Sequence, residues 1–219
     1  ADLAVNPELL AATPLIEEAM RTAGFDLDAR HPQPGTWISS EGMPVDLLIP
    51  DAVSGRTGRG RSGRIKPHSN MSTRRVRGIE GALVDHAPMT ITALDPDDHR
   101  EHQLQVAGPM ALLVAKLHKV SDREAEGARQ RPRDAHDVYR LLREVDLNVF
   151  VAGYARLAAA DVSRPVTEEA VAALDRLFSV PDSPGAAQVA EAVDGLVDEP
   201  RDLAVRCAVL AGQLLQAIS

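Results

Sequence analysis

The chain has 219 residues, of which 44% are hydrophobic and 26% are charged, so it is long enough to bury a core and has the balance of a globular protein. Its one cysteine, Cys207, excludes a disulfide framework within a single copy and favours a reducing compartment. No apolar run reaches the about 18 residues that a membrane helix needs, and no basic segment followed by an apolar run opens the sequence. We therefore expect a cytoplasmic protein with no membrane partner.

The first half of the sequence predicts a mixture of strands and helices. Asn6-Pro7-Glu8 supplies an N-cap, a proline at the first helical position and an early acid, so a helix is expected from there to about Gly24. The segment 54–70 is rich in glycine and arginine and predicts a loop. Strands are expected over residues 1–5, 25–30, 36–39, 45–49 and 89–94, of which 45–49 is the clearest because it is apolar on both faces.

From Gly108 onward the pattern becomes helical. Pro109 and Pro132 each stand at a predicted helix start, and turn residues separate the later amphipathic segments. Helices are expected over residues 108–121, 132–144, 147–160, 167–178, 185–196 and 201–218. The sequence therefore predicts an α+β protein, in which a mixed β-sheet with flanking helices (residues 1–106) is followed by a C-terminal helical bundle (residues 107–219).

Two aspartates stand inside predicted strands that are otherwise apolar. Asp46 lies in the strand 45–49 and Asp2 in the strand 1–5, and a buried carboxylate is costly unless it is paired or binds a metal. Carboxylates on adjacent strands can converge on Mg²⁺ ions, which bridge a triphosphate and activate an attacking hydroxyl. A structural alternative for Asp46 is that it caps a neighbouring loop or bridges to an arginine.

Charged side chains also occupy the apolar stripes of two predicted helices. Asp134 shares its stripe with Val138, and Asp137 lies on the same side of that helix. On the preceding helix Lys116 lies on the apolar side, and Arg123 repeats its face one heptad later. We expect Lys116 to pair with Asp134. Such a pair is either a purely structural ion pair or a means of presenting the lysine to triphosphate oxygens.

A basic segment follows the strand 45–49. The net charge of the chain is −8, yet residues 54–78 contain eight cations and no acid. The composition is typical of a solvated loop, but it also suits a phosphate-rich partner such as RNA. The whole chain has only six aromatic residues, so contact with the RNA backbone is expected rather than base stacking. The cations are Arg56, Arg59, Arg61, Arg64, Lys66, Arg74, Arg75 and Arg77, of which the first five are the candidate acceptor-binding residues.

The order of these motifs resembles that of the AbiEii/MenT-like nucleotidyltransferases of the polymerase-β-like superfamily. Those proteins commonly have a D-x-D strand, a second strand with an isolated aspartate, an L-x-x-K-L helix, an arginine and a helix with K/R-D-x-x-D. The resemblance covers about residues 1–143. The matching segments are Ala1-Asp2-Leu3-Ala4-Val5, Val45-Asp46-Leu47-Leu48-Ile49, Leu113-Val114-Ala115-Lys116-Leu117, Asp122-Arg123 and Arg133-Asp134-Ala135-His136-Asp137.

The resemblance implies a nucleotidyltransferase-like fold for the sheet domain and assigns roles to the charged residues. The Gly-Ser or Gly-Thr turn and the first aspartate of D-x-D would precede Ala1, and we expect both in the complete polypeptide. The implied roles are Mg²⁺ binding for Asp2 and Asp46, catalytic positioning of the nucleotide triphosphate for Lys116 and Asp134, and further nucleotide contacts for Arg123 and Asp137.

Three functions are compatible with these residues. The first is transfer of NMP from an NTP to RNA such as tRNA, as in the toxin members of the family, with a protein antitoxin as partner. The basic segment favours this acceptor. The second is modification of a small molecule such as an antibiotic, for which an acidic acceptor cleft is expected. The third is a catalytically silent module that binds a nucleotide or a protein partner.

Overall fold

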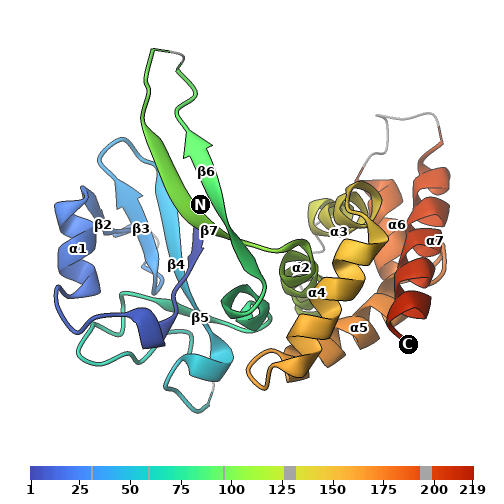
Figure 1. Ribbon diagram of the computed structural model, residues 1–219, viewed down its shortest axis with the longest axis horizontal. Coiled ribbons are helices and arrows are strands. Elements are labelled where there is room, and N and C mark those ends of the chain that lie inside the picture. The colour runs from blue at the N-terminus through green and yellow to red at the C-terminus, as the bar shows by residue number, and fades with distance from the viewer. Residues whose placement is uncertain (31, 59, 96, 126–131, 193–198) are drawn as a thin grey trace. The chain divides into compact units, whose positions relative to one another are not determined.

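The computed structural model (Figure 1) describes residues 1–219 apart from 31, 59, 96, 126–131 and 193–198. The chain divides into two compact units, Ala1–Glu80 and Gly81–Ser219. The first unit contains a mixed five-stranded sheet, and the second contains a β-hairpin and the helices α2–α7. The α+β class is therefore confirmed. The boundary lies at residue 80 instead of the expected 106, because the hairpin belongs to the second unit.

The first unit differs from expectation near its start and its end. The helix expected from Asn6 to Gly24 is interrupted, because Pro14 has no N–H for a helical hydrogen bond. The strand β5 is not predicted by the sequence, since its three residues include two arginines. The elements of this unit are β1 (Asp2–Ala4), η1 (Pro7–Leu9), α1 (Ile16–Thr22), β2 (Phe25–Leu27), β3 (Thr36–Ser39), β4 (Pro44–Pro50), η2 (Asp51–Val53) and β5 (Arg74–Val76).

The two faces of the sheet differ in character. The strands β1 and β4 run parallel, with Asp2 opposite Asp46, whereas β3 is antiparallel to β4. Side chains alternate between the faces of a strand. Trp37 and Leu47 accordingly point to one face, where they pack with Ile16 of α1 in the buried core of this unit. Asp2 and Asp46 lie on the opposite face.

One edge of β4 changes its partner at Gly35. The first part of β4 pairs with β3, and the later part pairs with β5 in parallel. Gly35 has φ +76°, and its carbonyl accepts a hydrogen bond from the Leu47 N–H at 2.7 Å. A Cβ here would overlap the amide nitrogen of Arg74 and the carbonyl oxygen of Leu47. Glycine therefore allows β5 to continue along the edge that β3 leaves, which brings Arg74 next to the Asp46 face.

The second unit matches the helical expectation closely. The strand expected at 89–94 is present as β6, but the sequence does not predict β7, which carries mostly polar side chains. The expected end of α6 at 196 lies outside the described residues. The elements are η3 (Glu80–Leu83, which begins at the boundary), β6 (His86–Thr92), β7 (Glu101–Ala107), α2 (Pro109–Ala125), α3 (Pro132–Glu144), α4 (Leu147–Ala159), α5 (Arg164–Phe178), α6 (Pro184–Glu191) and α7 (Pro200–Ile218).

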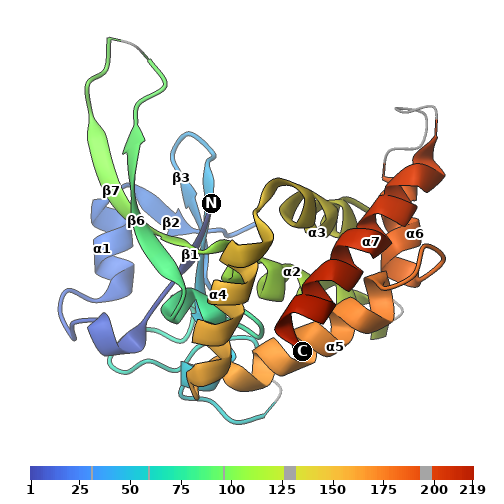
Figure 2. The ribbon, with the colours of Figure 1, turned by 45° about the vertical axis from the view of Figure 1, so that its right-hand side comes forward.

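The helices of the second unit surround one apolar core. Each contributes buried side chains at helical spacing, such as Leu117 of α2, Val138 of α3 and Phe178 of α5. Figure 2 shows α4, α5 and α7 packed side by side, and these three helices contact one another. Among the described helices we find no candidate for a membrane-spanning segment.

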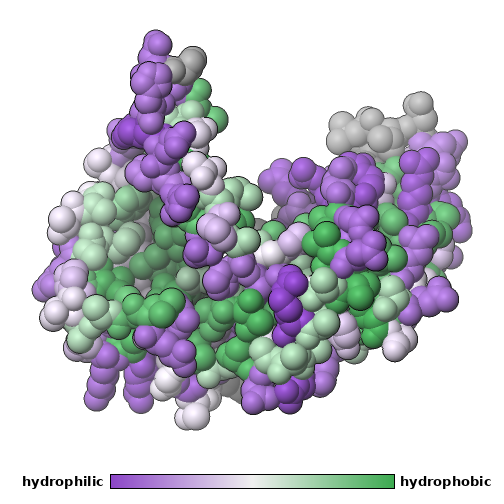
Figure 3. Space-filling view, in the orientation of Figure 1, coloured by the Kyte–Doolittle hydropathy of each residue, from purple (hydrophilic) through white to green (hydrophobic). Residues whose placement is uncertain are grey.

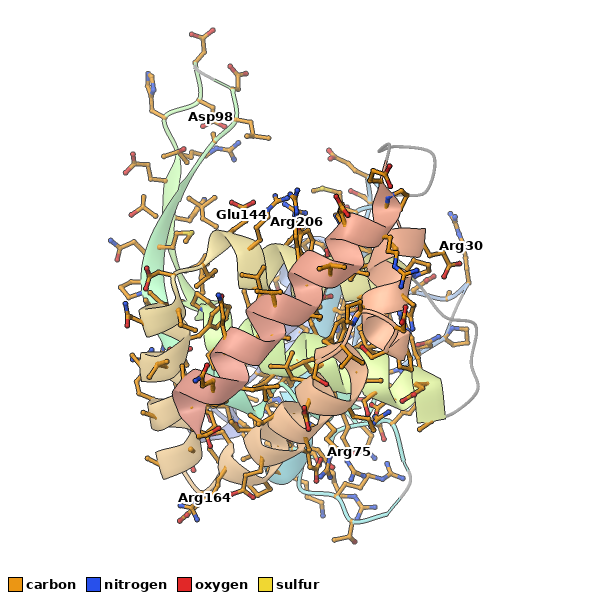
Figure 4. The ribbon with its side chains drawn as sticks, turned by 90° about the vertical axis from the view of Figure 1, so that its right-hand side faces the viewer. Arg30, Arg75, Asp98, Glu144, Arg164 and Arg206 are labelled. Atoms are coloured by element: carbon orange, nitrogen blue, oxygen red, sulfur yellow. The ribbon has the colours of Figure 1, made fainter. Side chains whose placement is uncertain are left out.

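The β6–β7 hairpin is attached to the helices at its base. Asp85, which directly precedes β6, is buried and forms an ion pair with Arg156 of α4 at 2.6 Å. The Gly108 N–H, directly after β7, donates to the Asp85 carbonyl at 2.7 Å. Figure 3 shows mostly hydrophilic residues toward the far end of the hairpin, where Figure 4 labels Asp98. These contacts at the base explain why the hairpin belongs to the second unit.

Candidate functional site

The two strand aspartates lie next to each other in the sheet. Asp2 of β1 and Asp46 of β4 are partners in the parallel register, so their side chains leave the same face of adjacent strands. Neighbouring strands are about 4.8 Å apart. Asp2 is exposed, and the Asp46 side chain is 25% exposed. The first unit thus presents a pair of carboxylates on the side opposite its apolar core.

The Asp46 carboxylate already has two protein partners. The Thr36 hydroxyl donates to Asp46 Oδ1 at 2.7 Å, and Arg74 Nη2 donates to Asp46 Oδ2 at 2.6 Å. Thr36 is the register partner of Asp46 on β3, and Arg74 is the partner of Leu48 on β5. The bridge to an arginine, which is the structural alternative for Asp46, is therefore present.

The carboxylate pair has the oxygen donors that Mg²⁺ prefers. Mg²⁺ is commonly bound by one or two carboxylates, with waters and substrate phosphates as its other ligands. Asp2 and Asp46 fit this mode through their shared register and shared face. Among the described residues there is no group of three or more His, Cys, Asp or Glu side chains that could hold a metal ion.

The second group of candidate residues joins α2 to α3. Lys116 Nζ contacts Asp137 Oδ2 at 2.6 Å. Lys119 Nζ contacts Asp134 Oδ1 at 3.0 Å, and Arg123 forms an ion pair with the other oxygen of Asp134. Three cations and two carboxylates thus meet where α2 and α3 adjoin, and such cations can donate charge-assisted hydrogen bonds to phosphate oxygens.

The expected pairing of Lys116 with Asp134 is wrong. Lys116 lies about two turns before Arg123 on α2, and Asp134 lies about one turn before Asp137 on α3. The earlier cation contacts the later acid, and the later cation contacts the earlier acid. This crossed order is the one that antiparallel helices produce, because their residue numbers run in opposite directions along the interface.

Asp134 is the most buried acid of the second group. Its side chain is 10% exposed, compared with 31% for Asp137. A buried carboxylate is stable only when its charge is compensated, and Asp134 has both Lys119 and Arg123 for this purpose. Asp134 therefore orients two cations, whereas Asp137 orients the single cation of Lys116.

Within the basic segment, backbone hydrogen bonds join the loop that precedes β5 to β5 and to the residue just before it. The Gly63 N–H donates to the Thr73 carbonyl at 3.0 Å, and the Arg75 N–H donates to the Arg61 carbonyl at 2.7 Å. The Arg75 guanidinium also donates to the Gly58 carbonyl. The described part of the segment is thus a structured loop, in contrast to the alternative of an unattached, solvated one.

The cations of this segment fall into paired and exposed sets. Arg75 and Arg77 both contact Asp51, and Arg74 contacts Asp46, so these three are compensated by acids. The Arg56 guanidinium donates to the Ser62 hydroxyl at 2.5 Å. Arg59 lies outside the described residues. Three candidate acceptor-binding residues have exposed side chains: Arg61, Arg64 and Lys66.

Sequence reasoning missed two residues of the carboxylate site. Thr36 lies in a predicted strand, but a threonine in a strand is ordinary and gives no signal of its own. Arg74 looks like one more cation of the basic segment, 28 residues after Asp46. Only the change of strand partner at Gly35 brings Arg74 into contact with Asp46.

The structure thus brings the candidate residues together in two groups, one in each unit. Asp2 and Asp46 form the first group with Thr36 and Arg74. The charged residues of α2 and α3 form the second. Comparison with family models, with curated proteins and with solved structures gives no match for this chain.

Proposed function

We propose that the protein is an Mg²⁺-dependent nucleotidyltransferase with a nucleotidyltransferase-like fold, which moves NMP from an NTP to RNA such as tRNA. We further propose that it is the toxin of a toxin–antitoxin pair. The observation that carries the proposal is the shared register of Asp2 and Asp46 on the sheet face opposite the apolar core. The resemblance to AbiEii/MenT-like proteins gives metal-binding roles to these same two positions.

The chain's own residues would bind and orient the reactants. Asp2 and Asp46 would hold Mg²⁺, which on binding supplies charge stabilisation for the phosphates and activation of the acceptor hydroxyl. Lys116 and Arg123 would donate to triphosphate oxygens, because charge-assisted hydrogen bonds from cations to phosphate are among the strongest in proteins. Asp137 and Asp134 would keep these two cations oriented through the ion pairs they already form.

The exposed cations of the basic segment support RNA as the acceptor. The exposed side chains are those of Arg61, Arg64 and Lys66, so their charges are accessible to a phosphate backbone. Binding through phosphate contacts does not depend on base sequence and weakens steeply as the salt concentration rises. We therefore expect backbone contacts to draw RNA to this loop, with little discrimination among bases by these three side chains.

Nucleotide transfer can be tested directly with the full-length protein, Mg²⁺, the four labelled NTPs and total tRNA. We expect label on RNA and a loss of at least about 100-fold in Asp46→Ala and Lys116→Ala, because each removes a side chain that contacts metal or phosphate. Arg176→Ala removes an exposed cation of α5 and serves as the control, with activity close to that of the unchanged protein. Absence of label on every RNA species in the presence of all four NTPs would refute the proposal.

The acceptor assignment needs a separate variant. In the double variant Arg61→Gln/Arg64→Gln we expect labelling of RNA to fall and to lose much of its salt dependence, while NTP affinity is retained. If the double variant labels RNA as well as the unchanged protein does, the loop is not the RNA-binding surface.

One observation favours a second candidate function, a silent module that binds a nucleotide without transferring it. Arg74 donates to the Asp46 carboxylate, and its positive charge would oppose a divalent cation at Asp46 for as long as the contact persists. NTP binding without transfer to any RNA or small-molecule acceptor would support this function. The two possibilities differ in whether Arg74 releases Asp46.

A further inference from the structure

Arg74 and Thr36 together occupy both oxygens of the Asp46 carboxylate. The Thr36 hydroxyl donates to Oδ1 at 2.7 Å and Arg74 Nη2 donates to Oδ2 at 2.6 Å. A carboxylate oxygen can accept more than one bond, so the neutral Thr36 contact is compatible with a cation at Asp46. The Arg74 contact is different, because its positive charge repels a divalent cation at the same carboxylate. Arg74 therefore competes with a metal for Asp46.

The position of Arg74 is set by the sheet. Its backbone is paired with Leu48 of β4, two residues after Asp46 and on the same face. A second guanidinium nitrogen contacts Gln33 Oε1 at 3.4 Å. The side chains of Arg74 and Asp46 are 23% and 25% exposed, so the pair is reachable by solvent and by a solute. An ion pair of this exposure contributes modestly to stability and can be exchanged for another.

We propose that Arg74 is a charge-exchange residue. It holds Asp46 while the divalent cation is absent, and it gives up Asp46 and donates to phosphate oxygens when the cation and the nucleotide arrive. This inference rests on the proposed function and adds a positioning residue to it. In the metal-free protein Arg74 also compensates the repulsion between the adjacent carboxylates of Asp2 and Asp46. Its guanidinium suits the second role because it can donate two hydrogen bonds to a phosphate.

The exchange predicts opposite effects of one substitution on two ligands. Mn²⁺, which has the same oxygen preference as Mg²⁺, can be followed by electron paramagnetic resonance. In Arg74→Gln we expect Mn²⁺ alone to bind about tenfold or more tightly, because a competing positive charge is removed. We expect inorganic tripolyphosphate, added with Mg²⁺, to bind about tenfold more weakly, because a phosphate donor is lost.

Arg75→Gln is the matched control. Arg75 is the next residue of β5, so its side chain leaves the opposite face of the sheet, and it pairs with Asp51 instead of Asp46. The substitution removes the same charge from the same strand. We expect the affinities for Mn²⁺ and for tripolyphosphate to remain within about twofold of those of the unchanged protein, which separates a local exchange from a general effect of net charge.

The outcomes distinguish the exchange from the proposed function. If the unchanged protein binds Mn²⁺ at a site that Asp46→Asn abolishes, but Arg74→Gln binds it no more tightly, then the exchange is refuted and the proposed function stands. If no Asp46-dependent Mn²⁺ binding occurs with or without tripolyphosphate, the proposed function is refuted and the exchange with it.

A second variant covers the possibility that Arg74→Gln does not fold. Arg74→Lys retains the positive charge but loses the guanidinium, which can donate two parallel hydrogen bonds to one phosphate. We expect it to bind Mn²⁺ as the unchanged protein does and to bind tripolyphosphate severalfold more weakly. Tripolyphosphate affinity equal to that of the unchanged protein would overturn the role of Arg74 as a phosphate donor.

Discussion

The two acids of α3 are expected to differ sharply in their contribution to stability. Asp134→Asn leaves Lys119 and Arg123 without their shared counter-charge at a carboxylate that is 10% exposed. Breaking a fully buried ion pair costs about 3–5 kcal/mol. The two cations here are 48% and 23% exposed and can turn partly toward water. We therefore expect a loss of about 2–3 kcal/mol in the free energy of unfolding, below the fully buried range.

Asp137→Asn is the matched comparison on the same helix. Asp137 and Lys116 are each 31% exposed, so their pair is worth about 1 kcal/mol or less. Unfolding can be followed by circular dichroism with heat and with urea. At about 2–4 °C per kcal/mol for a chain of this length, Tm should fall by about 4–12 °C in Asp134→Asn and by about 4 °C or less in Asp137→Asn. Equal losses in the two variants would refute the argument from burial.

Three further predictions concern single residues. Gly35→Ala should lower the free energy of unfolding by about 2 kcal/mol or more, because φ is +76° and a Cβ would overlap neighbouring backbone. Gly42→Ala, at φ +83° in open space, should lower it by about 1 kcal/mol, and equal losses in urea unfolding would contradict this reasoning. Burial opposes ionisation of Glu17, but hydrogen bonds from Ser72 and Ser69 outweigh it and lower its pKa below the usual 4.5. The ionised carboxylate of Glu17 therefore stabilises the fold above about pH 4.5, and this stabilisation is lost as the pH falls through the lowered pKa. Glu17→Gln should accordingly reduce Tm at pH 7 and have a smaller effect on Tm near pH 3. Burial raises the pKa of the Cys207 thiol to about 12, so iodoacetamide should modify the thiol slowly in the folded protein and rapidly in urea. Fast modification of the folded protein would show that the thiol is accessible.

Local patterns in the sequence determined most of the secondary structure of the second unit. Pro132 opens α3 and Glu144 closes it as expected, because a proline at a helix start and a regular apolar stripe are properties of a short segment. The same holds for β4, whose run of apolar residues makes the charge of Asp46 stand out. The sequence could therefore identify Asp46, Lys116 and Asp134 as unusual without any knowledge of their neighbours.

The partners of these residues were decided by tertiary structure. Lys116 meets Asp137 because α2 and α3 run in opposite directions, which spacing along one helix does not specify. Arg74 meets Asp46 because β4 changes its strand partner at Gly35, a contact between residues far apart in the chain. Sequence periodicity states which face of an element a side chain occupies, whereas the register and direction of the neighbouring element determine which group it touches. The identity of the charged residues was thus a local property of this protein, and their pairing depended on how the elements pack.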